Sequence, residues 1–280
     1  MTAPLLEVAG LRVSFRAQRG VLEAVRGISF AMGREKLGIV GESGSGKTLT
    51  GRSILRLLPP GAELRAERLA FDGVDLLAAS PARLRELRGR RLAMVMQDPK
   101  FSLNPVMLVG DQIAEAYLAH SGASRGEARQ KALAMLEAVR IRDPRRVYAL
   151  YPHEVSGGMG QRIMIAMMLA PGPDLLVADE PTSALDVTVQ MQVLAILDDL
   201  VSERGMGLIF ISHDLTLVAS FCDRVLVMYG GRVVETLDAG ELGRARHPYT
   251  RGLMACLPQL SGAEGDLPVL SRDPAWLEAP

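Results

Sequence analysis

The chain has few aromatic residues, few cysteines and no net charge. Aromatic residues make up 4% of its 280 residues, which argues against a surface that stacks nucleic-acid bases. The 32 basic and 32 acidic side chains cancel, so no overall basic field attracts nucleic acid. Two cysteines, Cys222 and Cys256, are too few for a disulfide scaffold, and a cytosolic setting is the simplest interpretation.

The sequence is also short of long apolar runs. No uninterrupted apolar stretch approaches the ~18 residues that a membrane span needs. The start, Met1–Pro4, has neither the basic nor the apolar region of a signal peptide, so we expect none. The hydrophobic content of 48% is ample for a packed core, and the length suits one large domain or one core with subdomains. If this protein works at a membrane, it must dock on something that spans it.

Lysine is the rare cation, because 28 of the 32 basic residues are Arg. Lys47 nevertheless stands in the stretch Gly41–Thr48, which reads Gly-Glu-Ser-Gly-Ser-Gly-Lys-Thr and has the spacing of a phosphate-binding P-loop. Its glycines let successive N–H groups turn toward an anion, Lys47 adds a point charge for the phosphates, and the Thr48 hydroxyl can bind Mg²⁺. Such a match arises by chance in about one chain in a hundred of this length, so a plain glycine-rich turn is the weaker interpretation.

The segments around this loop fit the pattern. Residues 37–40 predict a short buried strand, and residues 48–58 predict a helix that Pro59 and Pro60 stop. The start of that helix faces the phosphates. Three earlier segments alternate as strands do: residues 5–8, 11–15 and 24–30. Phe15 lies in one of them, and it is either core filler or a ring that stacks on a nucleobase.

The middle of the chain reads as helices inserted between core strands. An apolar strand at residues 92–96 ends at Gln97, a position that suits either a functional polar group or an ordinary glutamine. From residue 109 to 139 the periodicity is helical, with a break near 121–124 and capping-box spacing from Ser124 to Glu127.

A second possible anion site follows these helices. Ser156-Gly157-Gly158 precedes an apolar helix over residues 163–169, and free N–H groups at a helix start attract anions. The tripeptide alone is weak evidence, because most Ser-Gly-Gly sequences are merely turns.

Two later strands end in ionisable residues. Residues 175–178 predict a buried parallel strand followed by Asp179 and Glu180, and adjacent carboxylates there are costly unless a cation or ligand meets them. Beside a P-loop, Asp179 is expected to associate with Mg²⁺, and Glu180 can orient and deprotonate a water. The apolar strand at 208–212 ends at His213, on the edge where ligands bind open α/β sheets.

In this order, the motifs resemble the nucleotide-binding subunit of an ATP-binding cassette (ABC) transporter over residues 5 to 258. The resemblance implies an α/β fold: a P-loop NTPase (RecA-like) core with an antiparallel β subdomain and a helical subdomain inserted at about residues 100–170. It implies an ABC ATPase domain over residues 1–258 and a C-terminal extension over 236–280.

The same resemblance implies ATP and Mg²⁺ as cofactors and assigns roles to individual residues. The expected catalytic residues are Lys47, Gln97, Glu180 and His213. The expected Mg²⁺ ligands are Thr48, Gln97 and Asp179. The nucleotide is expected to contact the adenine-stacking Phe15, the Walker A residues Gly41, Glu42, Ser43, Gly44, Ser45, Gly46, Lys47 and Thr48, and the signature residues Ser156, Gly157 and Gly158. The D-loop falls at Ser183–Asp186.

Further motifs look like the dipeptide, oligopeptide and nickel importer group. These are Gln97-Asp98-Pro99 with Ser102–Pro105, Tyr151–Glu154, Met159 in the signature, and His247–Arg251. The chain departs from the group at Gly160, where an Arg is usual. Because only Cys256 lies in the tail, we expect no iron–sulfur cluster, and we expect residues 261–280 to be poorly ordered.

The resemblance also implies partners. Two ATPase subunits, expected to form a heterodimer, meet head to tail with each ATP between the Walker A of one and the signature of the other. They dock on two membrane permease subunits at the cytoplasmic face of the inner membrane, fed by an extracytoplasmic solute-binding protein, with no nucleic acid involved.

Three other functions compete with import. A soluble ABC ATPase acting on nucleic acid or ribosomes calls for coiled-coil insertions, zinc cysteines, a second cassette or a basic stripe, and the sequence has none of them. A regulatory subunit without turnover is disfavoured by Glu180 and His213, although Gly160 leaves it open. A small nucleotide kinase gives no reason for the Ser-Gly-Gly site or for the pair Asp179 and Glu180.

Overall fold

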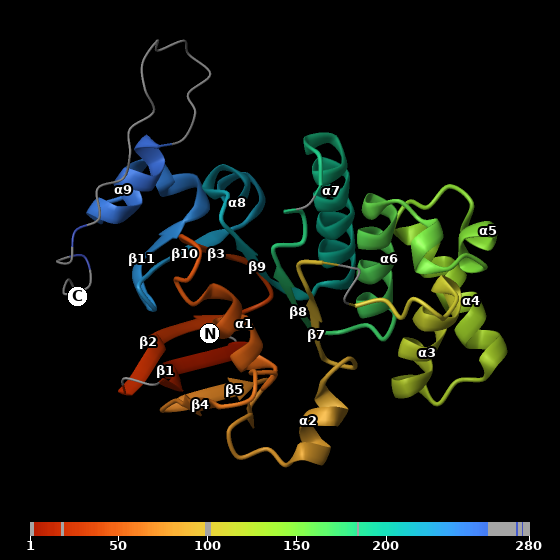
Figure 1. Cartoon of the computed structure of the whole chain (residues 1–280), viewed down its shortest axis with the longest axis horizontal. Helices are drawn as coiled ribbons and strands as arrows, with labels where there is room; N and C mark the ends of the chain where they lie inside the picture. Colours follow the sequence, from red (N-terminus) through yellow and green to blue (C-terminus); the bar gives the residue numbers. More distant parts are fainter. Residues whose placement is uncertain are drawn as a thin grey trace, which may run out of the picture. The chain divides into compact units, whose positions relative to one another are not determined.

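The computed structural model describes residues 3–17, 20–98, 102–183, 185–256, 273 and 276. The chain divides into two compact units, the first made of Met1–Ala78 and Ile209–Pro280 and the second of Ala79–Leu208 (Figure 1). The expected boundaries of a helical subdomain and of a C-terminal extension stay predictions. The expectation for residues 261–280 falls outside the described ranges, apart from Asp273 and Trp276.

An antiparallel sheet forms one part of the first unit. Its strand order is β2-β1-β5-β6, with β4 also paired to β1. These strands are β1 (Leu6–Ala17), β2 (Gly20–Met32), β4 (Ala62–Arg65), β5 (Arg68–Phe71) and β6 (Val74–Asp75). The two strands predicted at 5–8 and 11–15 are one strand, β1, whose pairing with β2 shifts register between Val8 and Leu11. Gly10 lies in this irregularity with a φ of 59°, so the strand bends without ending.

A second set of strands in the first unit has the order β11-β10-β3-β9. These are β3 (Lys36–Val40), β9 (Gly207–Ser212), β10 (Arg224–Tyr229) and β11 (Arg232–Asp238), and the first two residues of β9 belong to the second unit. Strands β3 and β10 are parallel, whereas β10 and β11 form an antiparallel hairpin. Gly230 (φ 53°) and Gly231 (φ 85°) make its turn, as the Gly-Gly pair predicts.

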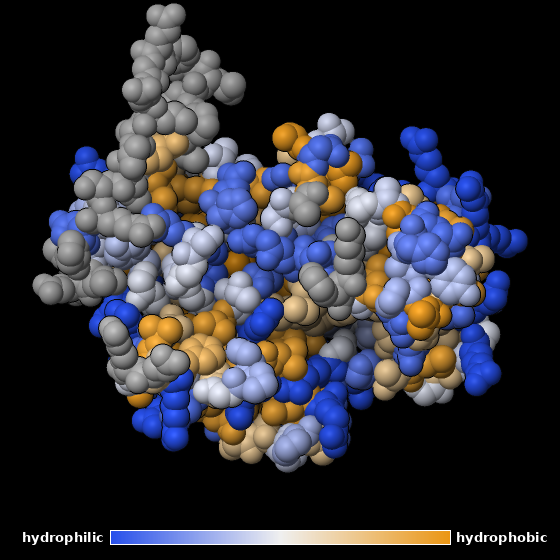
Figure 2. Space-filling model, viewed as in Figure 1, coloured by the Kyte–Doolittle hydropathy of each residue, from blue (hydrophilic) through white to orange (hydrophobic). Residues whose placement is uncertain are grey.

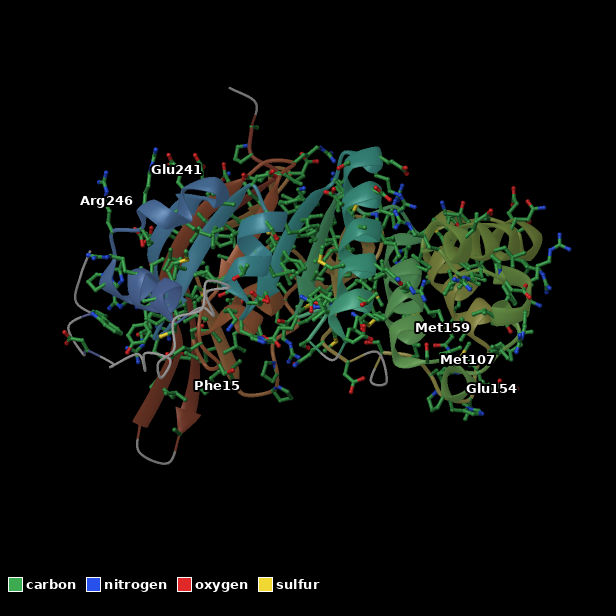
Figure 3. All side chains as sticks on the ribbon, turned by 90° about the horizontal axis from the view of Figure 1, so that it is seen from above. Phe15, Met107, Glu154, Met159, Glu241 and Arg246 are labelled. Carbon is green, nitrogen blue, oxygen red and sulfur yellow. The ribbon has the colours of Figure 1, made fainter. Side chains whose placement is uncertain are left out.

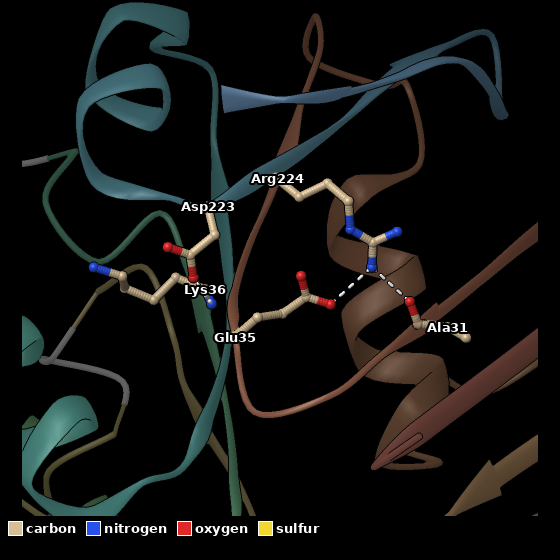
Figure 4. Close-up of polar contacts among 5 residues, drawn as sticks. All are labelled: Ala31, Glu35, Lys36, Asp223 and Arg224. Carbon is tan, nitrogen blue, oxygen red and sulfur yellow. Dashed lines mark hydrogen bonds and ion pairs between the residues drawn. The ribbon is translucent and has the colours of Figure 1, made fainter. Parts of the chain in front are cut away.

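Polar contacts join the beginnings of β3 and β10 (Figure 4). The Arg224 guanidinium donates to the carbonyl of Ala31 and pairs with the Glu35 carboxylate at 2.8 Å. The Lys36 amide donates to the carboxylate of Asp223 at 2.7 Å. These bonds hold the two parallel strands in register at the end opposite to the P-loop.

The described part of the first unit also contains three α-helices, α1 (Lys47–Ile54), α8 (Leu215–Phe221) and α9 (Pro248–Ala255), and the short 3-10 helix η3 (Ala239–Arg244). Helix α1 ends four residues earlier than the predicted limit at residue 58, so that prediction was wrong. Arg56 takes a left-handed conformation (φ 54°), which stops the helix before Pro59 and Pro60 are reached.

The second unit is mainly helical. Its elements are α2 (Pro81–Leu87), β7 (Leu92–Val95), α3 (Val109–Ser121), α4 (Arg125–Ala138), α5 (Pro144–Tyr148), the 3-10 helix η2 (Pro152–Glu154), α6 (Gly157–Leu169), β8 (Leu175–Asp179) and α7 (Val187–Arg204). Strands β7 and β8 pair in parallel, as their apolar composition predicts. The predicted capping box is present at α4, where Ser124 and Glu127 each accept a backbone N–H of the other. None of the helices in the described ranges has both the length and the apolar character that a bilayer crossing requires.

Gly110 allows two elements of the second unit to pack closely. It lies in the first turn of α3, and a Cβ there would stand 2.0 Å from the ring of Tyr148 at the end of α5. The Tyr148 hydroxyl also donates to the carboxylate of Asp111 at 2.8 Å. Burial and this bond raise the pKa of Tyr148 to about 12, so the phenol remains protonated and keeps donating.

We therefore expect Gly110→Ala to lower the free energy of unfolding by about 1–3 kcal/mol, because the added methyl group overpacks against Tyr148. Gly126→Ala is the matched control, since Gly126 is also the second residue of a helix and its Cβ would meet only the Ser124 hydroxyl oxygen at 3.9 Å. We expect that variant to be neutral or more stable by up to about 1 kcal/mol. Denaturant unfolding measures both, and equal changes in the two variants would contradict the packing argument.

Candidate nucleotide-binding site

The P-loop in the first unit requires glycine at two positions for reasons of space. Gly41 (φ 151°), Gly44 (φ 84°) and Gly46 (φ 98°) all have positive φ values. A Cβ on Gly41 would lie 2.1 Å from the carbonyl oxygen of Met228, and one on Gly46 would lie 2.8 Å from that of Ala24. Since neither carbonyl can move without moving its strand, only glycine fits, and the loop curls as an anion nest requires.

Helix α1 begins directly after this nest. Among the described residues no side chain caps the helix at Gly46, which leaves its first amides directed at the loop. Lys47 is 5% exposed, and its ammonium group donates to the carbonyls of Gly41 (2.7 Å) and Glu42 (2.9 Å). A buried positive charge, held over curled backbone at a helix start, fits the phosphates of a nucleotide.

The remaining loop residues differ in exposure. Ser43 and Gly44 are exposed at the tip, and Thr48 is half-buried. Ser45 is 4% exposed, and within the described structure its hydroxyl has no hydrogen-bond partner. Its carbonyl accepts the N–H of Gly231 at 3.2 Å. The β10–β11 hairpin thus supports the P-loop. The sequence did not reveal this role, because the Gly230-Gly231 pair indicates a turn but does not indicate which segment the turn contacts.

Phe15 lies on β1 of the first unit, where it pairs with Leu22 on β2 and Ala62 on β4 (Figure 3). Its side chain is half-buried, so Phe15 is not part of the fully buried core. Adenine stacking by this ring stays a prediction. His213, also in the first unit, follows β9 as an exposed residue, and the next residue, Asp214, caps α8 by accepting the Leu217 amide at 3.0 Å.

In the second unit, two of the expected catalytic side chains meet. The amide of Gln97, after β7, donates to the Glu180 carboxylate, after β8, at 3.2 Å. Asp179 is 4% exposed at the end of β8. Glu180 has a left-handed backbone (φ 48°), which is uncommon for a residue other than glycine and marks stored strain at functional sites. Parallel pairing of β7 and β8 explains the meeting, since both strands end at the same edge.

The signature residues lie at the start of α6. Ser156 is its N-cap, and the Ser156 hydroxyl accepts the Met159 amide at 3.4 Å. A Cβ on Gly158 would stand 2.7 Å from Cγ1 of Val189, so glycine lets α6 approach α7. Helix α6 begins at Gly157, six residues before the predicted start, and runs without interruption through Gly160. The replacement of the usual Arg by Gly160 therefore does not break the signature helix.

An arginine in the same helix also stabilises this region, and the sequence did not single it out. Arg162 donates from Nε to the carbonyl of Gly158 at 3.3 Å and from Nη1 to that of Arg140 at 3.0 Å. Burial lowers the pKa of Arg162 below its ordinary value. Met159 and Arg162 line a cavity of about 650 Å³ in the second unit. Figure 3 shows Met159 in the helical part of this unit with Met107 and Glu154.

The D-loop, Ser183–Asp186, follows Glu180 in the chain. The Ser183 amide and hydroxyl both donate to the Glu180 carbonyl, at 3.3 and 3.2 Å. Ala184 lies outside the described residues, and Asp186 caps α7 by accepting the Val189 amide at 3.0 Å. The two bonds from Ser183 stabilise the backbone of Glu180 and so help to orient its carboxylate.

The expected site residues thus fall in two groups. The first unit holds Phe15, the whole P-loop and His213, and the second holds Gln97, the signature residues, Asp179 and Glu180. No group of three or more His, Cys, Asp or Glu residues that could bind a metal occurs in the described ranges. The expected Mg²⁺ ligands, Thr48, Gln97 and Asp179, are not such a group, and they stay a prediction, as do the roles of the other residues.

We expect Gly46→Ala to weaken ATP binding by tenfold or more. An alanine strains the left-handed backbone by roughly 1–2 kcal/mol and contacts the Ala24 carbonyl, and both effects displace the amides of the nest. Gly33→Ala is the control, because a Cβ at Gly33 meets nothing within 4 Å. Titration with a fluorescent ATP analogue measures both variants, and unchanged affinity in Gly46→Ala would contradict the assignment of the loop.

Known proteins share much of this sequence and its fold. A probable peptide ABC transporter ATP-binding protein of Sinorhizobium fredii is 51% identical over 94% of this chain and 80% of its own length. The oligopeptide transport ATP-binding protein OppD of Bacillus subtilis is 46% identical over 99% of this chain and 78% of its own. The solved dimeric ATP-binding cassette MJ0796, bound to ADP and phosphate, superposes with a TM-score of 0.75 at 24% identity, covering 84% of this chain and 98% of that one.

The solved cassette confirms the predicted α/β P-loop fold class. The profile of the ABC transporter family matches residues 25–183, which include the P-loop, Gln97, the signature and the pair Asp179 and Glu180. The predicted resemblance is thereby confirmed. The chain belongs to the ABC transporter family and is one of its ATP-binding subunits, an ATPase.

Proposed function

We propose that this ATPase powers the import of peptides across the cytoplasmic membrane. The P-loop with its buried Lys47 ammonium group is the observation that carries the ATP-dependent part. The peptide part is supported by the relatives at 46–51% identity, which are named for peptide or oligopeptide transport.

In this proposal, the loop amides and Lys47 hold the β- and γ-phosphates of ATP. Thr48, Gln97 and Asp179 hold Mg²⁺, which would neutralise the charge that develops on the phosphates. Glu180 orients and deprotonates the attacking water, and His213 contacts the γ-phosphate. The hydrogen bond from Gln97 to Glu180 supports a shared role for these two side chains.

A second ATPase subunit completes the proposed site. The signature amides at the start of α6 are a second anion-binding position, separate in sequence from the P-loop. Val187 and Met191, four residues apart on one face of α7, are 76% and 58% exposed, and orange side chains lie over α7 in Figure 2. Such exposed apolar side chains beside the D-loop favour a protein partner. The dimeric state of MJ0796 is in line with this arrangement.

An importer also requires subunits that span the membrane and a protein that delivers the cargo. We propose a heterodimer with another ABC ATPase subunit, peripheral on the cytoplasmic face of the inner membrane, docked on two permease subunits. A solute-binding protein outside the membrane would deliver the cargo. Nickel remains a competing cargo, because the sequence motifs fit both classes of importer.

The test is reconstitution of the chain with its partner ATPase, permeases and binding protein in lipid vesicles. We expect loaded binding protein and peptide to stimulate ATP hydrolysis several-fold, because cargo delivery and ATPase closure are coupled in an importer. Lys47→Ala should abolish the hydrolysis. Stimulation by nickel in place of peptide would reject the peptide cargo, and stimulation by nucleic acid or ribosomes would reject import altogether.

We expect Glu180→Gln to lower kcat by about 10²–10⁴-fold, because the amide cannot accept the proton of the water. ATP should still bind, so this variant should accumulate as an ATP-bound dimer, visible by size-exclusion chromatography. Glu137→Gln, an exposed position on α4, is the control and should turn over normally. Full turnover by Glu180→Gln would reject Glu180 as the general base.

A further inference from the structure

A residue of the C-terminal helix contacts the P-loop directly. Tyr249, on α9, is 0% exposed, and its hydroxyl oxygen accepts the backbone N–H of Glu42 at 3.0 Å. The two residues are 207 positions apart in the sequence. Tyr249 also lies outside residues 25–183, the segment that the family profile matches. Tyr249 is part of the motif His247–Arg251, which resembles the dipeptide, oligopeptide and nickel importer group, so the contact joins that motif to the P-loop.

The bond acts on one particular peptide group. The N–H of Glu42 and the carbonyl of Gly41 belong to the same peptide unit, and that carbonyl accepts the Lys47 ammonium group at 2.7 Å. The peptide is thus held from both ends, by Tyr249 and by Lys47. Because Gly41 has a φ of 151° and no Cβ, its backbone alone does little to fix the orientation of this peptide. A flip of the peptide would turn the carbonyl away from Lys47.

The backbone before Tyr249 is itself anchored. His247 caps α9, and its Nδ1 accepts the Tyr249 amide at 3.2 Å. The Glu235 carboxylate on β11 accepts the amides of Arg246 at 2.6 Å and His247 at 3.2 Å. Arg246, labelled in Figure 3, lies just before the helix. These bonds tie the start of α9 to the same hairpin that supports the P-loop through Gly231.

Aromatic contacts fix the ring of Tyr249. Its centroid lies 4.5 Å from that of Tyr229, the last residue of β10, and 5.8 Å from that of Trp276. Tyr229 directly follows Met228, whose carbonyl faces Gly41. Because the Tyr249 ring is held by these neighbours, its hydroxyl already lies beside the P-loop. The side chain therefore loses little conformational entropy when it accepts the Glu42 amide.

We propose that Tyr249 is a positioning residue of the nucleotide site. By accepting the Glu42 N–H, its hydroxyl holds the Gly41–Glu42 peptide in the orientation that keeps Lys47 over the P-loop before ATP arrives. The segment from His247 to Tyr249 thereby belongs to the ATP-binding machinery. Without the hydroxyl, a smaller fraction of the protein has the competent loop, and the apparent affinity for ATP falls by that fraction.

The decisive variant is Tyr249→Phe, which keeps the ring and removes the hydroxyl. Loss of one neutral hydrogen bond changes an equilibrium constant by about three- to tenfold, so we expect the Kd for ATP of the full-length chain to rise by about that factor. In the assembled transporter, KM for ATP should rise equally and kcat at saturating ATP should stay within about twofold. A Tyr249 that serves only packing would lower the melting temperature and leave Kd and KM unchanged.

Tyr148→Phe is the matched control. Tyr148 is also a buried tyrosine, with 5% exposure and a hydroxyl bonded to Asp111, but it belongs to the second unit, whereas the P-loop belongs to the first. We expect it to alter stability and to leave the Kd for ATP unchanged. Equal increases of Kd in both variants would overturn the proposal, because the effect would then be a general one of lost stability.

Hydrogen exchange provides a second readout that does not depend on turnover. We expect the amide of Glu42 to exchange faster in Tyr249→Phe than in the wild type, and the amides of α4 to exchange at the same rate. Unchanged exchange at Glu42 would overturn the proposal. A wild type that binds ATP without peptide-stimulated turnover would contradict the import function and leave this comparison intact, because affinity and exchange are measured on the chain itself.

Discussion

The Lys47 ammonium group, buried against the carbonyls of its own loop, is the interaction on which the site depends. A charge in that position requires curled backbone around it, and the curl requires glycines whose missing side chains leave room for neighbouring carbonyls. The strands that supply those carbonyls, β2 and β10, must then approach the loop closely. The close packing of the first unit around β3 and α1 is therefore linked to the burial of this one lysine.

A comparable constraint shapes the second unit. Asp179 and Glu180 stand together at the end of a fully buried strand, and Glu180 has a left-handed backbone that the bonds of Ser183 help to hold. The amide of Gln97 meets the Glu180 carboxylate because β7 and β8 are parallel neighbours. Strain, buried charge and a cross-strand hydrogen bond coincide at this one edge, which is typical of a site that performs chemistry.

Glycine has a different task in the signature helix. Gly158 permits α6 to lie against Val189 of α7, and α6 continues through Gly160 although relatives in the peptide importer group usually carry an arginine there. Arg162 ties the Gly158 carbonyl to the turn at Arg140. The helix start that would face a partner's nucleotide is therefore held by packing and by this arginine, and a charge at position 160 is not needed for its geometry.

Local signals determined much of this protein. Glycine spacing, apolar strands that end in polar residues, and capping residues are properties of neighbours in the chain, so the P-loop, the carboxylate pair, the signature and the α4 cap could be predicted, along with the α/β class. Two features could not be predicted: α1 ends early at the left-handed Arg56, and β1 continues through Gly10. Local preferences for helix and strand are weak, and the folded chain overrides them. The bond from Gln97 to Glu180 and the hold of Tyr249 on Glu42 join residues 83 and 207 positions apart. Only the folded chain decides such contacts, because sequence spacing has no information about which distant segments pack together.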